Sequence, residues 1–319
     1  MRVTLLAGGV GGARMAAGMA ANLPPGHLTV IVNTGDDFEH LGLKICPDID
    51  TVCYTLAGME NPVTGWGRQG DTYQAIDVVA NLGGPAWFLL GDLDLGVHLE
   101  RTRRCKAGNP LSRITQDFCR AWGITTKVLP MTDDNTPTWV YTDDGKLSFQ
   151  EYFVHQRCMP KVIGFEFENI EHSKPAPGVC RSLDEADFVI ICPSNPFVSI
   201  DPILHVPGIK EAVKRRPVVA VSPLIAGKTV KGPAAKMFAE LGLVPSSLEV
   251  ARHYGDLLDG FVIDRQDQGL SAEFKQMGID VGVLDILMKT PEDRARLASE
   301  VLAFCARIME TRPKSSPPA

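Results

Sequence analysis

Aspartates are concentrated in two segments of the sequence. Four of them fall within fifteen residues and two more lie in the segment 90–98; together they are Asp36, Asp37, Asp48, Asp50, Asp92 and Asp94. One or two carboxylates, completed by substrate phosphates and water, are the usual ligands of Mg²⁺. A carboxylate can also act as a general base towards a hydroxyl nucleophile. The two segments therefore predict metal-assisted chemistry on a phosphate. The simpler interpretation is a set of helix and turn caps, with Asp50 capping a helix over 51–57.

A glycine-rich turn follows the first apolar run and precedes a predicted helix over 15–22. It contains four glycines: Gly8, Gly9, Gly11 and Gly12. Glycine lets the backbone pass close to an anion, and a helix N-terminus supplies amide donors and the positive end of a dipole. Arg14 stands where the dinucleotide fingerprint has Gly or Ala. The turn predicts phosphate binding and disfavours NAD; a turn that needs glycine only for packing is the alternative.

A second polar segment, 192–204, comes directly after another apolar run. Its three prolines fix φ and remove backbone donors, so we expect a stiff loop with almost no helix. In open α/β sheets, ligands bind at the carboxyl ends of the strands. The loop places hydroxyl and amide groups there that suit phosphates or nucleobase edges: Ser194, Asn195 and Ser199.

The segment 222–229 is close to a P-loop but departs from its pattern. It ends in Gly-Lys-Thr, but Ser222 replaces the leading glycine that lets such a loop wrap phosphates. Pro223 would also withdraw a backbone amide. We predict an ordinary ligand-facing loop, in which Lys228 and Lys231 can still meet a phosphate.

Short apolar runs, each bounded by Gly, Pro, Asn or Asp, alternate with helical stretches along the whole chain. The predicted strands are 3–7, 28–33, 87–90, 127–129, 187–192, 218–221, 261–263 and 281–284. This alternation predicts an α/β fold with a Rossmann-like, mainly parallel sheet and helices on both faces.

Residues 135–182 interrupt this alternation. Extended runs over 138–142 and 146–154 flank an Asp-Gly turn, which is a hairpin signature, and a further extended run covers 162–170. We predict a nucleotide-binding core of 1–134 and 183–311, with 135–182 as a small mixed β-containing insertion that forms one wall of the cleft. The final helix, 291–309, should pack on the core, and 312–319 should be a disordered tail.

The composition excludes several classes of protein. The 319 residues are 45% hydrophobic, enough for a large core, and the net charge of −6 argues against a general grip on nucleic acid. No apolar run approaches the length of a membrane span, and the start of the chain is not a signal peptide. Eight scattered cysteines favour reduced thiols, so we expect a cytoplasmic protein. Neither a zinc motif nor a G-x-S-x-G elbow is present.

Taken together, several segments closely resemble the 2-phospho-L-lactate transferase family of coenzyme F-420 biosynthesis. They run in family order over most of the chain: 8–12 (GGVGG), 33–37 (NTGDD), 47–52 (PDIDTV), 66–67 (WG), 90–92 (LGD), 129–131 (LPM), 149–152 (FQEY), 193–196 (PSNP) and 221–223 (VSP). The resemblance implies transfer of a phospho-acid from a guanosine-diphosphate-linked donor to the deazaflavin Fo, with Mg²⁺ present and release of GMP. It also implies that Asp50 contacts Fo and helps to deprotonate its ribityl hydroxyl.

The resemblance also assigns site residues. A guanine nucleotide should lie along the glycine turn and the 193–201 loop, and Trp139, Phe149 or Tyr152 should be available to stack on Fo. We expect Asp50 and Asp37 to be catalytic, and Mg²⁺ to be held by Asp37, Asp48 and Asp50. The remaining substrate-binding residues should be Asn33, Thr34 and Asp92, beside the glycines and the three polar residues of the loop. Enzymes of this size and fold often form homodimers.

One segment departs from the family pattern and leaves the donor open. The family commonly has Gly-Asp-Arg-Asp, whereas residues 91–94 here read Gly-Asp-Leu-Asp, so a cation that could meet the donor is lost. The donor acid is therefore 2-phospholactate, phosphoenolpyruvate or 3-phosphoglycerate. Other classes also remain open: an NAD- or nucleotide-sugar-binding oxidoreductase or nucleotidyltransferase, and a non-catalytic nucleotide-binding regulatory protein of the same fold.

Overall fold

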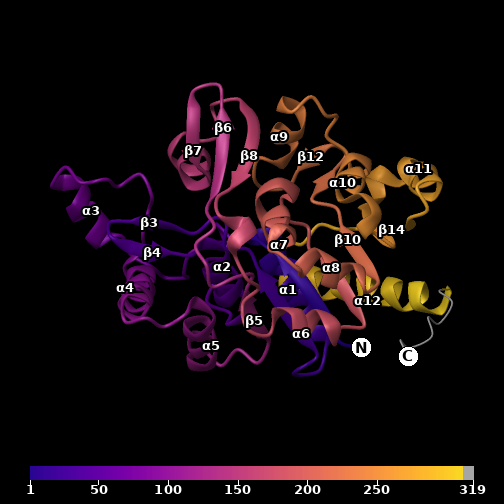
Figure 1. Ribbon diagram of the computed structural model, residues 1–319, viewed down its shortest axis with the longest axis horizontal. Coiled ribbons are helices and arrows are strands. Elements are labelled where there is room, and N and C mark those ends of the chain that lie inside the picture. The colour runs from indigo at the N-terminus through magenta and orange to yellow at the C-terminus, as the bar shows by residue number, and fades with distance from the viewer. Residues whose placement is uncertain (312–319) are drawn as a thin grey trace.

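The computed structural model describes residues 1–311 and is built around a sheet of seven parallel strands (Figure 1). In the order in which they pair, the strands are β14 (Asp280–Leu284), β13 (Gly260–Asp264), β10 (Val218–Val221), β9 (Phe188–Ile191), β1 (Val3–Ala7), β2 (Leu28–Val32) and β5 (Lys127–Pro130). All of these pairs are parallel. The predicted Rossmann-like α/β fold is confirmed.

Helices cover both faces of this sheet because its strands are apolar on both sides. Along β1, Leu5 and Ala7 belong to one buried cluster and Leu6 belongs to the other. The first cluster is completed by α1 (Gly9–Asn22), α2 (Pro47–Leu56) and α12 (Pro291–Thr311). The second is completed by α6 (Val179–Asp184), α7 (Asp201–His205), α8 (Ile209–Lys214), α9 (Ala234–Glu240) and α10 (Ser247–Tyr254).

Residues 138–167 form a separate antiparallel sheet of three strands. Its strands are β6 (Thr138–Thr142), β7 (Gly145–Ser148) and β8 (Val162–Phe167), with β6 in the centre. This confirms the small β-containing insertion, but β7 ends at Ser148 rather than at 154. A π-helix, Glu151–His155, follows it and places Tyr152 in the core.

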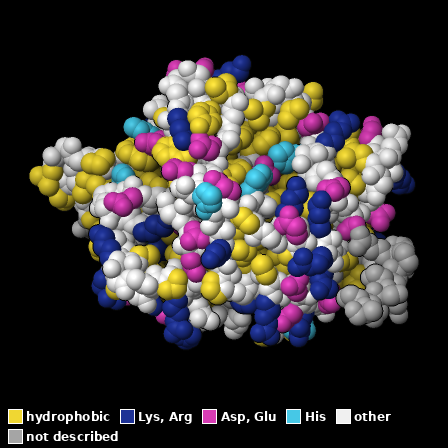
Figure 2. Space-filling view, viewed as in Figure 1, with side chains coloured by type: hydrophobic (Ala, Val, Ile, Leu, Met, Phe, Trp, Pro, Cys, Tyr) yellow, Lys and Arg dark blue, Asp and Glu magenta, His cyan; other side chains and the backbone are white. Residues whose placement is uncertain are grey.

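Two short hairpins and the remaining helices complete the described chain. The hairpins are β3 (Phe38–His40) with β4 (Leu43–Ile45), and β11 (Leu224–Ile225) with β12 (Lys228–Thr229). The helices are α3 (Gln74–Asn81), α4 (Asp92–Lys106), α5 (Leu111–Ala121) and α11 (Ser271–Gln276). Helix α3 projects at one end of the molecule, where Val78 and Leu82 contribute to a hydrophobic surface (Figure 2).

Four predictions about local structure need comment. Residues 87–90 are not a strand, because Trp87 and Phe88 pack on the aromatic rings of β3 instead of pairing in the sheet. Asp50 does not cap a helix; α2 begins at Pro47 and places Asp50 in its first turn. The segment after β9 is not a loop, since a π-helix (Pro196–Ile200) and α7 form there, and Pro196 and Pro202 stand in their first turns, where proline is tolerated. The predicted tail, 312–319, lies outside the described residues.

None of the helices among residues 1–311 combines the length and apolarity that crossing a membrane requires.

Candidate active site

The glycine-rich segment after β1 forms the N-cap and first turn of α1, which begins at Gly9 rather than at 15, and it packs tightly against the segment that follows β9. A Cβ atom on Gly11 would lie 2.1 Å from the carbonyl oxygen of Pro193, and one on Gly8 would lie 2.6 Å from Cβ of Ser199. The hydroxyl of Ser194 donates to the carbonyl of Gly8 at 2.7 Å and accepts from its amide at 3.2 Å. Glycine is therefore needed here for close approach, and the turn and the Ser194 segment form one surface.

Asp48 connects this turn to strand β2. Its carboxylate accepts from the amide of Gly9 at 2.7 Å and from the side-chain amide of Asn33 at 3.0 Å. Asn33 also donates to the carbonyl of Val198 at 3.1 Å, so it links β2 to the Pro196–Ile200 helix. Burial raises the pKa of Asp48 to about 6, although both hydrogen bonds favour the ionised form.

Beside Asp48, the segment 34–37 contains buried oxygens that have no partner. These atoms are Oγ1 of Thr34, Oδ1 of Asp36 and Oδ1 of Asp37. The other oxygen of Asp37 accepts from Sγ of Cys46 at 3.0 Å and lies 3.2 Å from Nζ of Lys44. Burial and the neighbouring charge of Asp48 raise the pKa of Asp36 well above its usual range. Unpaired buried oxygens are costly, so this segment is suited to bind a ligand or an ion.

A cavity of about 450 Å³ opens next to this segment. Asp37 and Lys44 line one side of it, and Asp133, Asp134 and Asn135 line another. The buried Asp37 thus lies beside a space between the β3–β4 hairpin, α4 and the residues after β5.

A second acidic group forms where α2 and α4 meet. Arg101, only 1% exposed, donates to Oδ1 of Asp50, and Nδ1 of His98 lies 3.7 Å from Oδ2 of the same carboxylate. Nε2 of His98 lies 3.4 Å from Asp94, whose other oxygen accepts from the hydroxyl of Tyr54 at 2.5 Å. We call these residues the Asp50 group: Asp50, Tyr54, Asp94, His98 and Arg101.

The electrostatics of the Asp50 group keep Oδ2 of Asp50 available for chemistry. Burial raises the pKa of Asp50, and the charges of Arg101 and His98 act in the opposite direction. Oδ2 of Asp50 is buried and has no hydrogen-bond partner. Within residues 1–311, Asp50, Asp94 and His98 are the one set of three acidic, His or Cys residues whose ligand atoms all lie within 4.8 Å of one another.

Sequence reasoning missed Tyr54, His98 and Arg101. A signal was present for the last two, because Asp94, His98 and Arg101 follow one another at intervals of four and three residues and therefore share one face of α4. It could not show that this face meets Asp50.

Several predicted site residues lie away from the Asp50 group. Asp92 accepts from Thr72 and from the amides of Gln74 and Ala75, so it holds the start of α3. The ring nitrogen of Trp139 donates to Glu168 at 2.5 Å. The amide oxygen of Asn195 caps the Pro196–Ile200 helix by accepting from the Phe197 amide at 3.1 Å.

Of the three aromatics expected to stack on a ligand, two are in the core. Tyr152 is fully buried, and Phe149 is 7% exposed and stacks on Phe153 with ring centroids 5.5 Å apart. Trp139 remains half-buried on β6, with Nζ of Lys146 4.7 Å from its ring centroid. The insertion therefore offers Trp139, rather than Phe149 or Tyr152, for stacking.

The comparison with protein families decides the identity of the chain. Residues 3–293 match the family model described as 2-phospho-L-lactate transferase CofD. The chain belongs to the CofD family. The CofD resemblance and the prediction of a transferase of this type are thereby confirmed.

Curated relatives support this assignment over nearly the full length of both chains. Proteins named phosphoenolpyruvate transferase from Streptomyces griseus and Thermobifida fusca are 42% and 41% identical to this CofD family member. Each alignment covers 97% of this chain and 99% of the relative.

A solved structure shares the fold. A protein from Bacillus halodurans superposes with a TM-score of 0.61 over 94% of this chain and 99% of its own, at 16% identity. At that identity the match supports the Rossmann-like architecture alone.

Proposed function

We propose that this CofD family protein transfers an enolpyruvyl phosphate group from a guanosine-diphosphate-linked donor to the deazaflavin Fo in coenzyme F-420 biosynthesis. Two observations support it: the relatives at 41–42% identity are named phosphoenolpyruvate transferases, and the Asp50 group has a buried carboxylate oxygen with no partner. The relatives favour phosphoenolpyruvate over 2-phospholactate and 3-phosphoglycerate as the donor acid. The alternative classes considered above, including NAD-dependent enzymes, lack this support.

In the proposed reaction, Asp50 is the general base. The terminal ribityl hydroxyl of Fo attacks the donor phosphorus that bears the enolpyruvyl oxygen, and the bond from that phosphorus to the GMP phosphate breaks. The hydroxyl proton passes to Oδ2 of Asp50, and GMP leaves. Burial raises the pKa of Asp50, which makes its carboxylate a stronger proton acceptor than a solvent-exposed one. Arg101 fixes the other oxygen of the carboxylate and so aims the free one.

Magnesium is part of this proposal. Asp37 and Asp50 each keep one buried oxygen free of hydrogen bonds, and hard carboxylate oxygens with substrate phosphates are what Mg²⁺ prefers. Among residues 1–311, however, Asp37, Asp48 and Asp50 do not bring three ligand atoms within 4.8 Å of one another. We propose these three residues around the ion, with Asp37 as its main ligand, because both oxygens of Asp48 accept hydrogen bonds and Oδ2 of Asp50 is the proposed proton acceptor. Bound Mg²⁺ would stabilise the charge that develops on the transferred phosphate.

The proposed nucleotide site is the surface shared by the glycine turn and the 193–201 segment. The Gly9 amide is taken by Asp48, but the next amides of the first turn of α1 have no intrahelical partner and can donate to a phosphate. Gly8, Gly11 and Gly12 bring this turn against neighbouring protein atoms, whereas Gly9 has no atom within 4 Å of its Cβ position and faces open space. Ser194, Asn195 and Ser199 supply polar groups beside the turn. Asn33 and Thr34 border the same surface, where Oγ1 of Thr34 is unpaired. We propose that Fo lies against the 135–182 insertion, with Trp139 stacking on it, and that Asp92 contributes by holding α3.

The test is an assay of the purified protein with Fo, Mg²⁺ and each of the three guanylated phospho-acids, with products identified by mass spectrometry. We expect the Fo adduct and GMP, formed fastest with the phosphoenolpyruvate donor. A faster reaction with another donor would overturn the choice of acid. No product from any donor, with GDP still bound in a thermal-shift assay, would favour the non-catalytic nucleotide-binding protein.

Three further parts of the proposal concern the protein's surroundings. We propose a homodimer, a cytoplasmic location and no nucleic-acid partner. Light scattering after size-exclusion chromatography tests the dimer, and cell fractionation tests the location.

A further inference from the structure

Two cysteines lie close together next to the Asp50 group. Sγ of Cys53, on α2, is 3.7 Å from Sγ of Cys119, on α5, and both are free thiols. A disulfide bond requires a sulfur–sulfur distance of about 2.05 Å. A movement of less than about 2 Å would therefore bring the two sulfurs to bonding distance. Cys53 follows Asp50 by three residues on the same helix.

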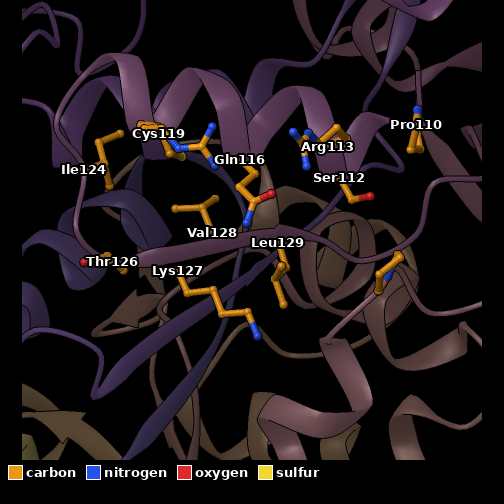
Figure 3. Close-up of a pocket in the computed structure, with 12 residues that line it drawn as sticks. Pro110, Ser112, Arg113, Gln116, Cys119, Ile124, Thr126, Lys127, Val128 and Leu129 are labelled. Atoms are coloured by element: carbon orange, nitrogen blue, oxygen red, sulfur yellow. The ribbon is translucent and has the colours of Figure 1, made fainter. Parts of the chain in front are cut away.

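One of the two thiols lines a large pocket. Cys119 lines a pocket of about 600 Å³ between α5 and β5, the edge strand of the main sheet, whereas Cys53 does not (Figure 3). Figure 3 shows Cys119, Gln116 and Arg113 on the helix side and Val128 and Leu129 on the strand side. A small molecule in this pocket can therefore reach Cys119 first.

The charge of the pocket indicates what kind of molecule it accepts. Its lining includes Arg113, Arg120 and Lys127 and contains no carboxylate. Arg113 and Arg120 share Asp117 at 3.4 and 3.1 Å, but their side chains are 59% and 66% exposed and can turn towards a ligand. The remaining lining is mostly apolar, so the pocket suits a small anionic molecule with an uncharged centre.

We propose that this pocket is a thiol–disulfide exchange site. It binds a small disulfide that carries carboxylates, and this disulfide oxidises Cys53 and Cys119 to a disulfide bond. The Cys119 thiolate attacks one sulfur of the bound disulfide, which forms a mixed disulfide and releases the first thiolate. Cys53 then attacks Sγ of Cys119, which forms the Cys53–Cys119 bond and releases the second. The protein loses two electrons and two protons, and the small disulfide becomes two thiols.

The bond would act on the Asp50 group through the neighbours of Cys119 on α5. The ring of Phe118 lies under the guanidinium of Arg101, 5.9 Å from its centroid, and Trp122 packs on Tyr54 with centroids 5.6 Å apart. Formation of the bond draws Cys119 towards Cys53 and therefore shifts Phe118 and Trp122 relative to Arg101 and Tyr54, two members of the Asp50 group.

Exposure alone predicts a different result, which makes the proposal testable. Cys105, Cys158 and Cys180 are half-buried, whereas Cys53 and Cys119 are buried. The reduced full-length protein is incubated with oxidised glutathione and its cysteines are mapped by mass spectrometry. We expect the Cys53–Cys119 disulfide to form before any other cysteine is modified. The Cys53→Ser variant should accumulate glutathione on Cys119, and the Cys119→Ser variant should leave Cys53 free. Faster modification of Cys105, Cys158 or Cys180, or modification of Cys53 without Cys119, would overturn the proposal.

The anionic character of the ligand has its own test. Replacing Arg113 and Arg120 together by Gln should slow oxidation by oxidised glutathione about three- to tenfold and leave the rate with uncharged 2-hydroxyethyl disulfide unchanged. Arg103→Gln is the matched control, because it removes an exposed arginine from α4 that does not line the pocket. Equal slowing with both disulfides would refute the anionic site.

The effect on transfer activity is measured last, and this arm alone rests on the proposed function. Oxidised wild-type protein should catalyse transfer more slowly than reduced protein, and dithiothreitol should restore the rate. In the Cys53→Ser variant, treatment with the oxidant should leave the transfer rate unchanged. If neither the wild type nor any variant catalyses transfer, the proposed function is wrong, but the mass-spectrometric mapping of the cysteines still tests the thiol–disulfide exchange site. If transfer proceeds equally in both states, the link to the Asp50 group is wrong.

Discussion

The guanidinium of Arg101 is buried against the carboxylate of Asp50, so the proposed base is one half of an ion pair inside the protein. Such a pair couples stability to catalysis, because removing either partner leaves a charge in a low-dielectric environment. It also explains why one oxygen of Asp50 is fixed and the other is free.

Replacing Arg101 by Met should destabilise the protein strongly. The substitution leaves the buried Asp50 carboxylate without its guanidinium partner, so we expect the free energy of unfolding in urea to fall by about 3–5 kcal/mol. Arg103→Met is the control on the same helix: its side chain is 68% exposed, so losing its pair with Glu100 should leave the free energy of unfolding almost unchanged. Similar losses in the two variants would show that the Arg101 pair is not structurally important.

Asp50→Asn should abolish most transfer, and it should also cost stability, because Arg101 loses its counter-charge. We expect transfer to slow by about 10²- to 10⁴-fold, measured at a temperature where circular dichroism shows folded protein. The double variant Asp50→Leu with Arg101→Met replaces the pair by apolar side chains and should regain much of the lost stability without regaining activity. A near-normal rate in Asp50→Asn would exclude Asp50 as the base.

Gly11→Ala should disrupt the first turn of α1, where it packs on the segment after β9. The new Cβ would lie 2.1 Å from a backbone oxygen of Pro193, which cannot move without shifting the segment after β9, so we expect a loss of about 2 kcal/mol or more in the free energy of unfolding. Gly96→Ala is the matched control, because no atom lies within 4 Å of its Cβ position in the middle of α4. That change should stabilise the helix by up to about 1 kcal/mol. If both substitutions behave alike, the close packing of the turn is not what requires glycine.

Metal-free protein should lose stability as the pH rises from about 4 to about 6. The pKa of Asp48 is raised from 3.8 to about 6, so the folded state holds a proton that the unfolded chain has already released. The contribution is fully present below pH 4 and is lost as Asp48 ionises; at about 1.4 kcal/mol per pKa unit it amounts to about 3 kcal/mol. Urea unfolding of wild type and of Asp48→Asn across this range, with EDTA present, measures it. A wild-type pH dependence that persists unchanged in Asp48→Asn would assign it to another group.

Magnesium affinity should depend on Asp37 more than on His98. Asp37 offers a free hard oxygen, whereas an imidazole nitrogen is a poor ligand for Mg²⁺. By calorimetry with GDP present, we expect Asp37→Asn to weaken Mg²⁺ binding about tenfold or more and His98→Gln to change it less than about threefold. The opposite order would place the ion at Asp50, Asp94 and His98 instead.

The framework of the protein could be predicted from the chain alone. The seven strands of the main sheet are short apolar runs with sharp boundaries, because strands inside a parallel sheet are buried on both faces and admit few polar residues. The glycine turn, the acidic segments and the family could likewise be predicted, since each depends on residues that are close together in the chain.

Which side chains meet depends on how the helices pack, and this could not be predicted from the sequence. The run 87–90 has the composition of a strand, but Trp87 and Phe88 pack on Phe38 of β3. An apolar segment can pack on neighbouring rings without pairing in the sheet. Arg101 and His98 reach Asp50, and Cys119 reaches Cys53, through the packing of α4 and α5 on α2. Hydrophobic periodicity shows that a helix has a buried face but not which helix covers it, and for that reason the partners of the candidate base were not evident from the chain alone.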